Sequence, residues 1–275
     1  MKRQRDTLMA LFMASALTSC KATSSDVKNN GPEIQTDVYP GSLLLTITLN
    51  LEGGEVEHAT CTGSFISPRY FLTAAHCTVD PLTSAKIIDR EFTISANKGS
   101  SPQIKSKIFT PHPDYPGQSR LKNDVVEWIL VSFNPNQDIG LGYSDVSIID
   151  VGKDQETFIP IKIAKSIPQV GERVHIVGFG VQPTTGEPSG VKRAGTNLIY
   201  RNERGGLHTQ VNEKNAGTAD VTVVGGGDSG GALYNDQGEA VGTVSISVFT
   251  DNVYVQLQHP KVQAFLKPFL QNNQR

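Results

Sequence analysis

The stretch VVGGGDSGGALY, from Val223 to Tyr234, places five glycines around one aspartate and one serine. Its flanking valines and its Ala-Leu-Tyr end are typical of β-strands. Glycine loses more backbone entropy on folding than any other residue, so a run of glycines in a strand-like region is costly. We therefore infer that Ser229 needs unhindered backbone around it.

Short β-rich segments continue on both sides of this stretch from about residue 38 onward. They are rich in Val, Ile, Thr and aromatic residues, and clusters of Gly, Pro and Asn separate them. The expected strands are 42–51, 59–67, 70–75, 90–95, 105–110, 125–133, 173–181, 196–200, 220–224, 239–248 and 252–257. Because no long helices intervene, the pattern predicts all-β sandwiches or barrels.

One helix is expected near the C-terminus, at about residues 259–272. Its apolar residues recur at helical spacing, which predicts one face packed against the core. These residues are Val262, Phe265, Leu266, Phe269 and Leu270. Pro268 lies inside the pattern and should kink or shorten the helix.

Three local motifs contain a histidine, an aspartate and a serine in that chain order. LTAAHC contains His76, HPDYPGQSRLKND ends on Asp124, and GDSGG contains Ser229. Together they resemble the chymotrypsin/trypsin family of serine proteases, over roughly residues 38–272. The resemblance implies that His76 is the general base, Asp124 orients its imidazole and Ser229 is the nucleophile. It also implies an oxyanion hole formed by the backbone N–H groups of Gly227 and Ser229.

The aspartate of this motif set has one competitor and one irregular feature. Asp114 is the alternative acid, although its HPDY context is typical of a turn. The segment after Asp124 includes Glu127, where the family usually has apolar residues. We expect Asp124 to be the orienting acid.

The resemblance implies two six-stranded antiparallel β-barrels of the chymotrypsin type, followed by the C-terminal helix. Barrel one is expected at about 38–150 and barrel two at about 151–258, with a boundary in the turn-rich zone 145–158. Cys61 and Cys77 match the family's disulfide beside the catalytic histidine. Closing a loop of about fifteen residues contributes roughly 3 kcal/mol in the chain-entropy model.

Two readings from other classes compete with a trypsin-like protease. GDSGG also fits the G-x-S-x-G elbow of α/β-hydrolases, but that fold needs a helix after the serine and a later histidine. The residues after Ser229 predict a β-hairpin and only His259 follows, which argues against an esterase on that fold. A non-catalytic binding module on the same barrels remains the alternative, although such relatives usually lack a triad member.

The resemblance assigns a specificity pocket whose floor lies six residues before the serine, at Val223. Val224, Ser247 and Asn252 complete it, and Ser245 to Ser247 offer an edge for β-pairing with a peptide. Family members that cleave after Arg or Lys have an aspartate at the floor. Valine there predicts a preference for apolar or small side chains and poor cleavage after basic residues.

Activation is an open question in this sequence. In much of the family, cleavage creates an amino terminus that pairs with the aspartate before the serine, here Asp228. The usual Ile/Val-Val-Gly-Gly tetrapeptide is absent, although Ile34 and Val38 lie at about the right distance before Cys61. Either a nonstandard cleavage occurs near residues 30–38, or Asp228 has another partner.

Residues 1–19 combine a basic start with a short apolar run, which predicts an export signal. The following LTSC resembles the bacterial lipobox, which implies lipid attachment at Cys20 and a tether or propeptide over 20–37. An ordinary secretory signal is the alternative. The three cysteines fit lipidation, because a Cys61–Cys77 pair leaves Cys20 over.

The 275 residues have a net charge of -2, which gives no indication of a nucleic-acid partner. No metal-ligand cluster or phosphate-binding loop occurs, so we expect no cofactor. The sequence thus predicts a monomeric peptidase domain over 38–275 that acts on proteins or peptides. We expect it at the bacterial cell envelope through a lipid anchor, or secreted if it is not lipidated.

Overall fold

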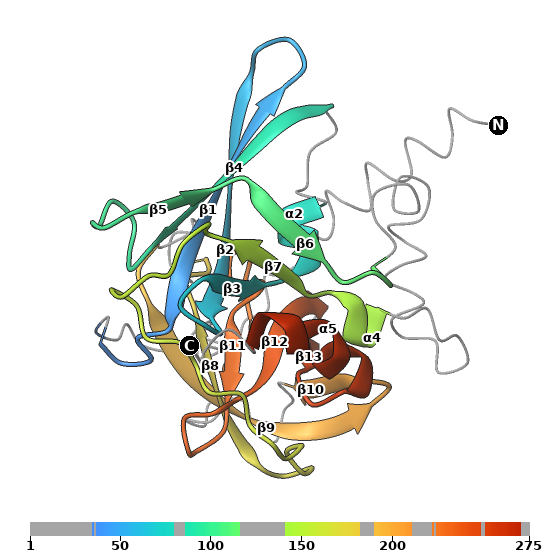
Figure 1. Cartoon of the computed structure of the whole chain (residues 1–275). Coiled ribbons are helices and arrows are strands. Elements are labelled where there is room, and N and C mark those ends of the chain that lie inside the picture. Colours follow the sequence, from blue (N-terminus) through green and yellow to red (C-terminus); the bar gives the residue numbers. More distant parts are fainter. Residues whose placement is uncertain are drawn as a thin grey trace, which may run out of the picture.

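The computed structural model describes residues 35, 37–79, 86–115, 141–181, 190–210, 222, 224–248 and 251–270. The expected signal peptide, Cys20, Asp124 and Val223 lie outside these residues. Two antiparallel sheets follow one another along the chain, the first from blue to green and the second from yellow to red (Figure 1). No helix among the described residues is long and apolar enough to cross a membrane.

The first sheet has seven strands in the order β5-β4-β1-β2-β3-β7-β6. The strands are β1 (Ser42–Leu51), β2 (Val56–Phe65), β3 (Tyr70–Thr73), β4 (Ile87–Ser95), β5 (Ile104–Ser106), β6 (Ile108–Pro111) and β7 (Ser147–Asp150). Lys107 alone separates β5 from β6 in the chain, yet these two strands lie at opposite ends of the sheet. The sheet must therefore curl into a barrel.

The second sheet is a closed barrel in the order β10-β13-β12-β11-β8-β9. Its strands are β8 (Arg173–Gly178), β9 (Arg193–Glu203), β10 (Gly206–Gln210), β11 (Ala232–Tyr234), β12 (Ala240–Val248) and β13 (Asp251–Gln256). The prediction of an all-β fold with two antiparallel barrels is confirmed. The first sheet has seven strands among the described residues, where six were expected.

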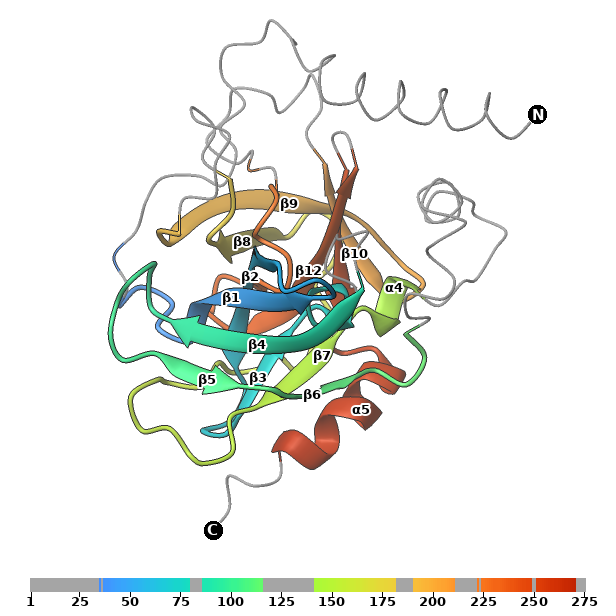
Figure 2. The same ribbon diagram turned by 90° about the horizontal axis from the view of Figure 1, so that it is seen from above.

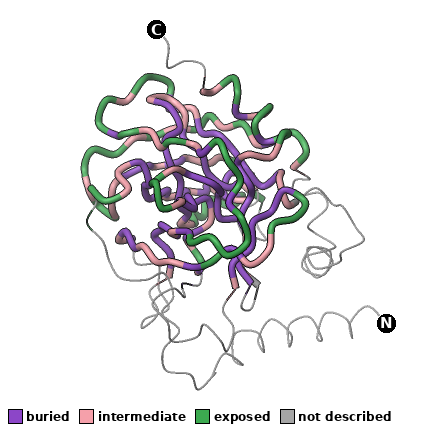
Figure 3. Tube along the Cα trace, turned by 90° about the horizontal axis from the view of Figure 1, so that it is seen from below, coloured by how far each residue is buried: buried purple, intermediate pink, exposed green. Residues whose placement is uncertain are grey.

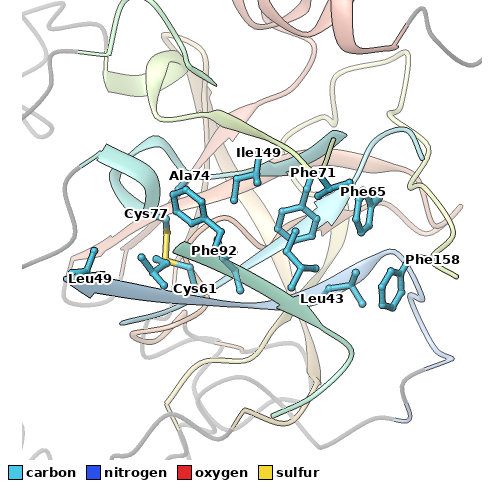
Figure 4. Close-up of a cluster of buried hydrophobic side chains, with 14 of the residues drawn as sticks. Leu43, Leu49, Cys61, Phe65, Phe71, Ala74, Cys77, Phe92, Ile149 and Phe158 are labelled. Atoms are coloured by element: carbon cyan, nitrogen blue, oxygen red, sulfur yellow. A yellow bond between two sulfur atoms is a disulfide. The ribbon is translucent and has the colours of Figure 1, made fainter. Parts of the chain in front are cut away.

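Alternating burial explains why these segments form strands. In β1, Leu43, Leu45, Ile47 and Leu49 recur at every second position and are all buried. They meet aromatic residues of the neighbouring strands in the core of barrel one, which Figure 4 shows next to the Cys61–Cys77 disulfide. Buried segments run through both barrels, and exposed residues gather in the outer turns (Figure 3).

The zone 145–158, expected to be turn-rich, begins instead with strand β7. Ile148 and Ile149 are buried there, and the strand pairs with both β3 and β6. Burial of the apolar residues therefore favours a strand here, despite the turn-forming residues around them. Strands β10 and β11 were also not expected, because each is short and lies beside glycines.

Helix α5 (Pro260–Leu270) ends the described chain and confirms the expected C-terminal helix. Val262 and Leu266 are its buried residues, and the helix packs on the lower edge of the barrels in Figure 2. Pro268 lies inside the helix without ending it. Only two helical residues follow, so the proline removes a backbone hydrogen bond near a terminus that frays anyway.

Candidate active site

His76 lies in the short helix α2 (Ala75–Val79), directly after strand β3. The next residue, Cys77, is bonded to Cys61 of β2, so the predicted disulfide is present. The bridge attaches the histidine segment to the core of barrel one. The His76 side chain is 29% exposed, so its ring borders solvent.

A buried carboxylate that the sequence reasoning did not select contacts this ring. Asp145 Oδ2 lies 2.8 Å from His76 Nδ1, and Asp145 Oδ1 accepts the His76 backbone N–H at 2.9 Å. The Ser245 hydroxyl donates a third hydrogen bond to Oδ2, at 2.6 Å. These three bonds fix both the ring and the carboxylate.

The charge of Asp145 follows from these contacts. Burial alone raises the pKa of this carboxyl, but attraction to His76 and hydrogen bonds from His76 and Ser245 outweigh burial and hold the pKa below its usual value. An ionised carboxylate only accepts hydrogen bonds, so Nδ1 of His76 must carry a proton. In a neutral ring, Nε2 then has the lone pair that a general base needs.

Among the described residues, Asp145 is the carboxylate that contacts the His76 ring, in the place expected for Asp124. Asp124 lies outside the described residues. The alternative acid, Asp114, lies in an exposed cluster, where it accepts hydrogen bonds from Tyr143 and Lys261 at 2.9 and 2.8 Å. The signal for Asp145 was the sequence DVSII, in which the aspartate comes just before the buried residues of β7.

Ser229 belongs to barrel two, but its backbone contacts barrel one. Its carbonyl accepts the Thr62 N–H of β2 at 2.8 Å and lies 3.8 Å from the sulfur of Cys77. Gly230, with φ +83°, leaves no room for a side chain, because a Cβ there would lie 2.3 Å from the Thr62 carbonyl. The glycines around Ser229 thus allow the two barrels to approach closely next to His76.

The two predicted oxyanion donors have fixed peptide orientations. The Gly226 carbonyl accepts the Val181 N–H at 2.8 Å, and the Asp228 carbonyl accepts the Gly231 N–H at 2.8 Å. Because a trans peptide is planar, the N–H groups of Gly227 and Ser229 point the opposite way. Within the described part of the chain, neither N–H has a hydrogen-bond partner, so both can bind an anion.

Three of the four predicted pocket residues can be placed, while Val223 lies outside the described residues. Buried Asn252 accepts the Val224 N–H at 3.1 Å and the Ser247 hydroxyl at 2.9 Å. Its amide group donates to Thr209 Oγ1 at 3.1 Å. Asn252 thus joins Val224 and Ser247 through uncharged groups.

One cluster of potential metal ligands occurs among the described residues, formed by Cys61, His76 and Cys77. Both cysteine sulfurs are already joined in the disulfide. A disulfide sulfur is not the thiolate that binds metals. This cluster therefore does not fit a metal centre.

Comparison with known proteins agrees with the fold. Human heparin binding protein is 16% identical, with a TM-score of 0.59 over 90% of this chain and 98% of its own. Neuropsin, a serine protease expressed in the limbic system of mouse brain, is 19% identical, with a TM-score of 0.58 over 87% of this chain and 98% of its own. The family model described as Trypsin matches residues 35–258. The chain belongs to the trypsin family.

Proposed function

We propose that this protein is a serine endopeptidase that hydrolyses peptide bonds through an acyl-enzyme. Ser229 attacks the carbonyl carbon, His76 takes the serine proton and returns it to the leaving amine, and Asp145 orients the imidazole. The N–H groups of Gly227 and Ser229 bind the oxyanion of the tetrahedral intermediate. The observation that supports this most is the hydrogen-bond chain from Ser245 through Asp145 to His76, next to the backbone of Ser229.

Labelling with a fluorophosphonate tests the proposal, because such reagents phosphonylate only an activated serine. We expect the full chain to be labelled at Ser229, with no labelling of Ser229→Ala. The matched control is Ser166→Ala, which removes an exposed serine that belongs to none of the three motifs. This variant should be labelled like the wild type. A folded wild type that takes no label would instead favour a non-catalytic binding module.

The substrate preference rests on the neutral groups around Asn252. We propose that the pocket accepts a small or apolar side chain before the scissile bond. A basic side chain would lose its hydration there, and Val224, Ser247 and Asn252 provide no carboxylate to compensate. Cleavage of a peptide library measures which residue precedes the scissile bond. A profile dominated by cleavage after Arg or Lys would contradict the proposal.

We also propose that the protein is exported and attached to a membrane by lipid on Cys20, where it acts as a monomer on proteins or peptides. The support is the sequence MKRQR, the apolar run after it, and LTSC. Metabolic labelling with a radioactive fatty acid should mark the wild type and not Cys20→Ala. Equal labelling of the two chains would exclude Cys20 as the attachment site.

A further inference from the structure

Asp228, the residue before Ser229, is a buried carboxylate with an unusual set of partners. It is 1% exposed, and its Oδ1 accepts the Gly180 N–H at 2.7 Å while its Oδ2 accepts the Gly225 N–H at 2.9 Å. Of the described residues, none forms an ion pair with it. Arg193 of β9 acts on it only through longer-range attraction. Both carboxylate oxygens are therefore satisfied by backbone groups.

The two donors come from different parts of barrel two. Gly180 follows strand β8, whereas Gly225 begins the loop that leads to Ser229. A Cβ at Gly180 would lie 2.5 Å from the carboxylate, and one at Gly178 would lie 2.1 Å from it. The carboxylate fits only against bare backbone, so it fastens the Ser229 loop tightly to the turn after β8.

The same turn after β8 also holds the peptide groups next to the two proposed oxyanion donors. The Gly226 carbonyl, which sets the direction of the Gly227 N–H, is bonded to Val181, the residue after Gly180. The Gly227 carbonyl accepts the Thr62 hydroxyl at 2.8 Å, and the same hydroxyl oxygen accepts the Phe179 N–H at 3.1 Å. Residues 179–181 therefore fix the loop at Asp228 and on either side of Gly227.

Val38 lies in the segment where an activating cleavage was one of two alternatives, and it has other contacts. Val38 is 44% exposed, and its N–H donates to the Gln35 carbonyl at 3.2 Å. Its carbonyl and that of Tyr39 accept the buried Lys192 ammonium at 3.4 and 3.0 Å. In the uncut chain Val38 is thus bound by Lys192 while Asp228 is bound by amides. Ile34 lies outside the described residues.

We propose that Asp228 is a positioning residue that shapes the oxyanion-binding loop through the N–H groups of Gly180 and Gly225 in the intact chain. No amino terminus created by cleavage is then required to form the site. This inference rests on the proposed function, because it concerns the readiness of the same Ser229. On this inference the uncut single chain is already active, and no activating cleavage is needed.

The first test uses the full chain, with intact-mass spectrometry showing that residues 30–38 are uncut. We expect this chain to react with a fluorophosphonate and to hydrolyse peptide as fast, within about threefold, as any form cut in that region. An inert intact chain that becomes reactive only after cleavage would overturn the inference and leave the proposed function standing. If neither form reacts, the proposed function fails, and the inference fails with it.

The second test replaces the carboxylate. In Asp228→Asn one oxygen still accepts an N–H, but the new NH2 group faces the other donor, so one fastening bond is lost. We expect kcat to fall about 10²–10³-fold, as on loss of one oxyanion donor, with KM changed less than about threefold. Asp236→Asn, which changes an exposed carboxylate on His175, is the matched control. A folded Asp228→Asn with wild-type kcat would refute the positioning role.

Discussion

Asp145 and Asp228 are both almost fully buried beside the same serine loop, yet their carboxyl groups behave in opposite ways. The pKa of Asp145 is lowered, because the His76 ring and the Ser245 hydroxyl outweigh the cost of burial. Burial raises the pKa of Asp228 to about 6, and two backbone N–H groups and distant Arg193 compensate only in part. Equal burial therefore does not imply an equal pKa.

The difference separates two uses of a buried acid. A carboxylate beside a ring that gains positive charge during a reaction stabilises that charge, as we propose for Asp145 and His76. A carboxylate with only amide partners accepts charge-assisted hydrogen bonds and thereby holds backbone segments together. We therefore propose that Asp145 supports proton transfer at His76, whereas Asp228 sets the geometry of the Ser229 loop.

The largest expected effect follows from changing Asp145, the acid that contacts His76. Asp145→Asn removes the acceptor that fixes the His76 tautomer, and in well-characterised triad proteases the same change lowers kcat about 10⁴-fold. Asp124→Asn is the matched control, since Asp124 was the acid expected from sequence, and it should keep kcat within about twofold. Steady-state kinetics on both variants decides between them. A large loss in Asp124→Asn alone would reverse the assignment.

A smaller effect concerns stability against pH. Because Asp228 binds its proton more tightly when folded, the free energy of unfolding should fall as pH rises from about 4 to about 6. The shift of about two units corresponds to roughly 3 kcal/mol. Asp145 has the opposite sign: its contribution is present above the unfolded pKa and is lost as pH falls below about 4.

Urea denaturation at several pH values measures this difference. Wild type and Asp228→Asn are compared in a Ser229→Ala background, which prevents self-cleavage. Their difference in unfolding free energy should shrink, or change sign, from pH 4 to pH 7. Arg193 and Tyr254 interact electrostatically with Asp228 in the structure. Burial raises the pKa of Tyr254, so its hydroxyl stays neutral over this range. A difference that is constant with pH would show that Asp228 titrates normally.

The smallest expected effect sharpens the role of Ser245. Ser245→Ala removes the hydroxyl donor at 2.6 Å from Asp145 and raises the pKa of that carboxyl. Loss of one hydrogen bond to a charged group should lower kcat/KM about tenfold. Ser166→Ala again serves as control. An unchanged kcat/KM would mean that His76 alone fixes Asp145.

The parts of the candidate site that could be predicted from sequence are those that lie in short, distinctive motifs. Ser229 and His76 lie in short motifs with distinctive neighbours, and the pairing of Cys61 with Cys77 followed from the same resemblance. The all-β architecture followed from strand patterns such as that of 42–51. These features need only nearby residues, so they can be inferred without a structure.

The orienting acid and the partners of Asp228 were harder to predict, for physical reasons. Asp124 and Asp145 each precede a valine in a strand-like segment, so the neighbouring residue types do not separate them. The contacts of Asp145 with the ring and the backbone N–H of His76 are what point to Asp145. The partners of Asp228 are backbone N–H groups, which leave no trace in residue identity.

The contact between the Ser229 carbonyl and the Thr62 N–H has a consequence for the cell that makes this protein. Under the proposed function, the nucleophile comes from barrel two, whereas its base and the orienting acid come from barrel one. A nascent chain with only one barrel folded would then hold half of the proposed catalytic groups. Proteolysis would start only once the two barrels have docked, without a separate inhibitor.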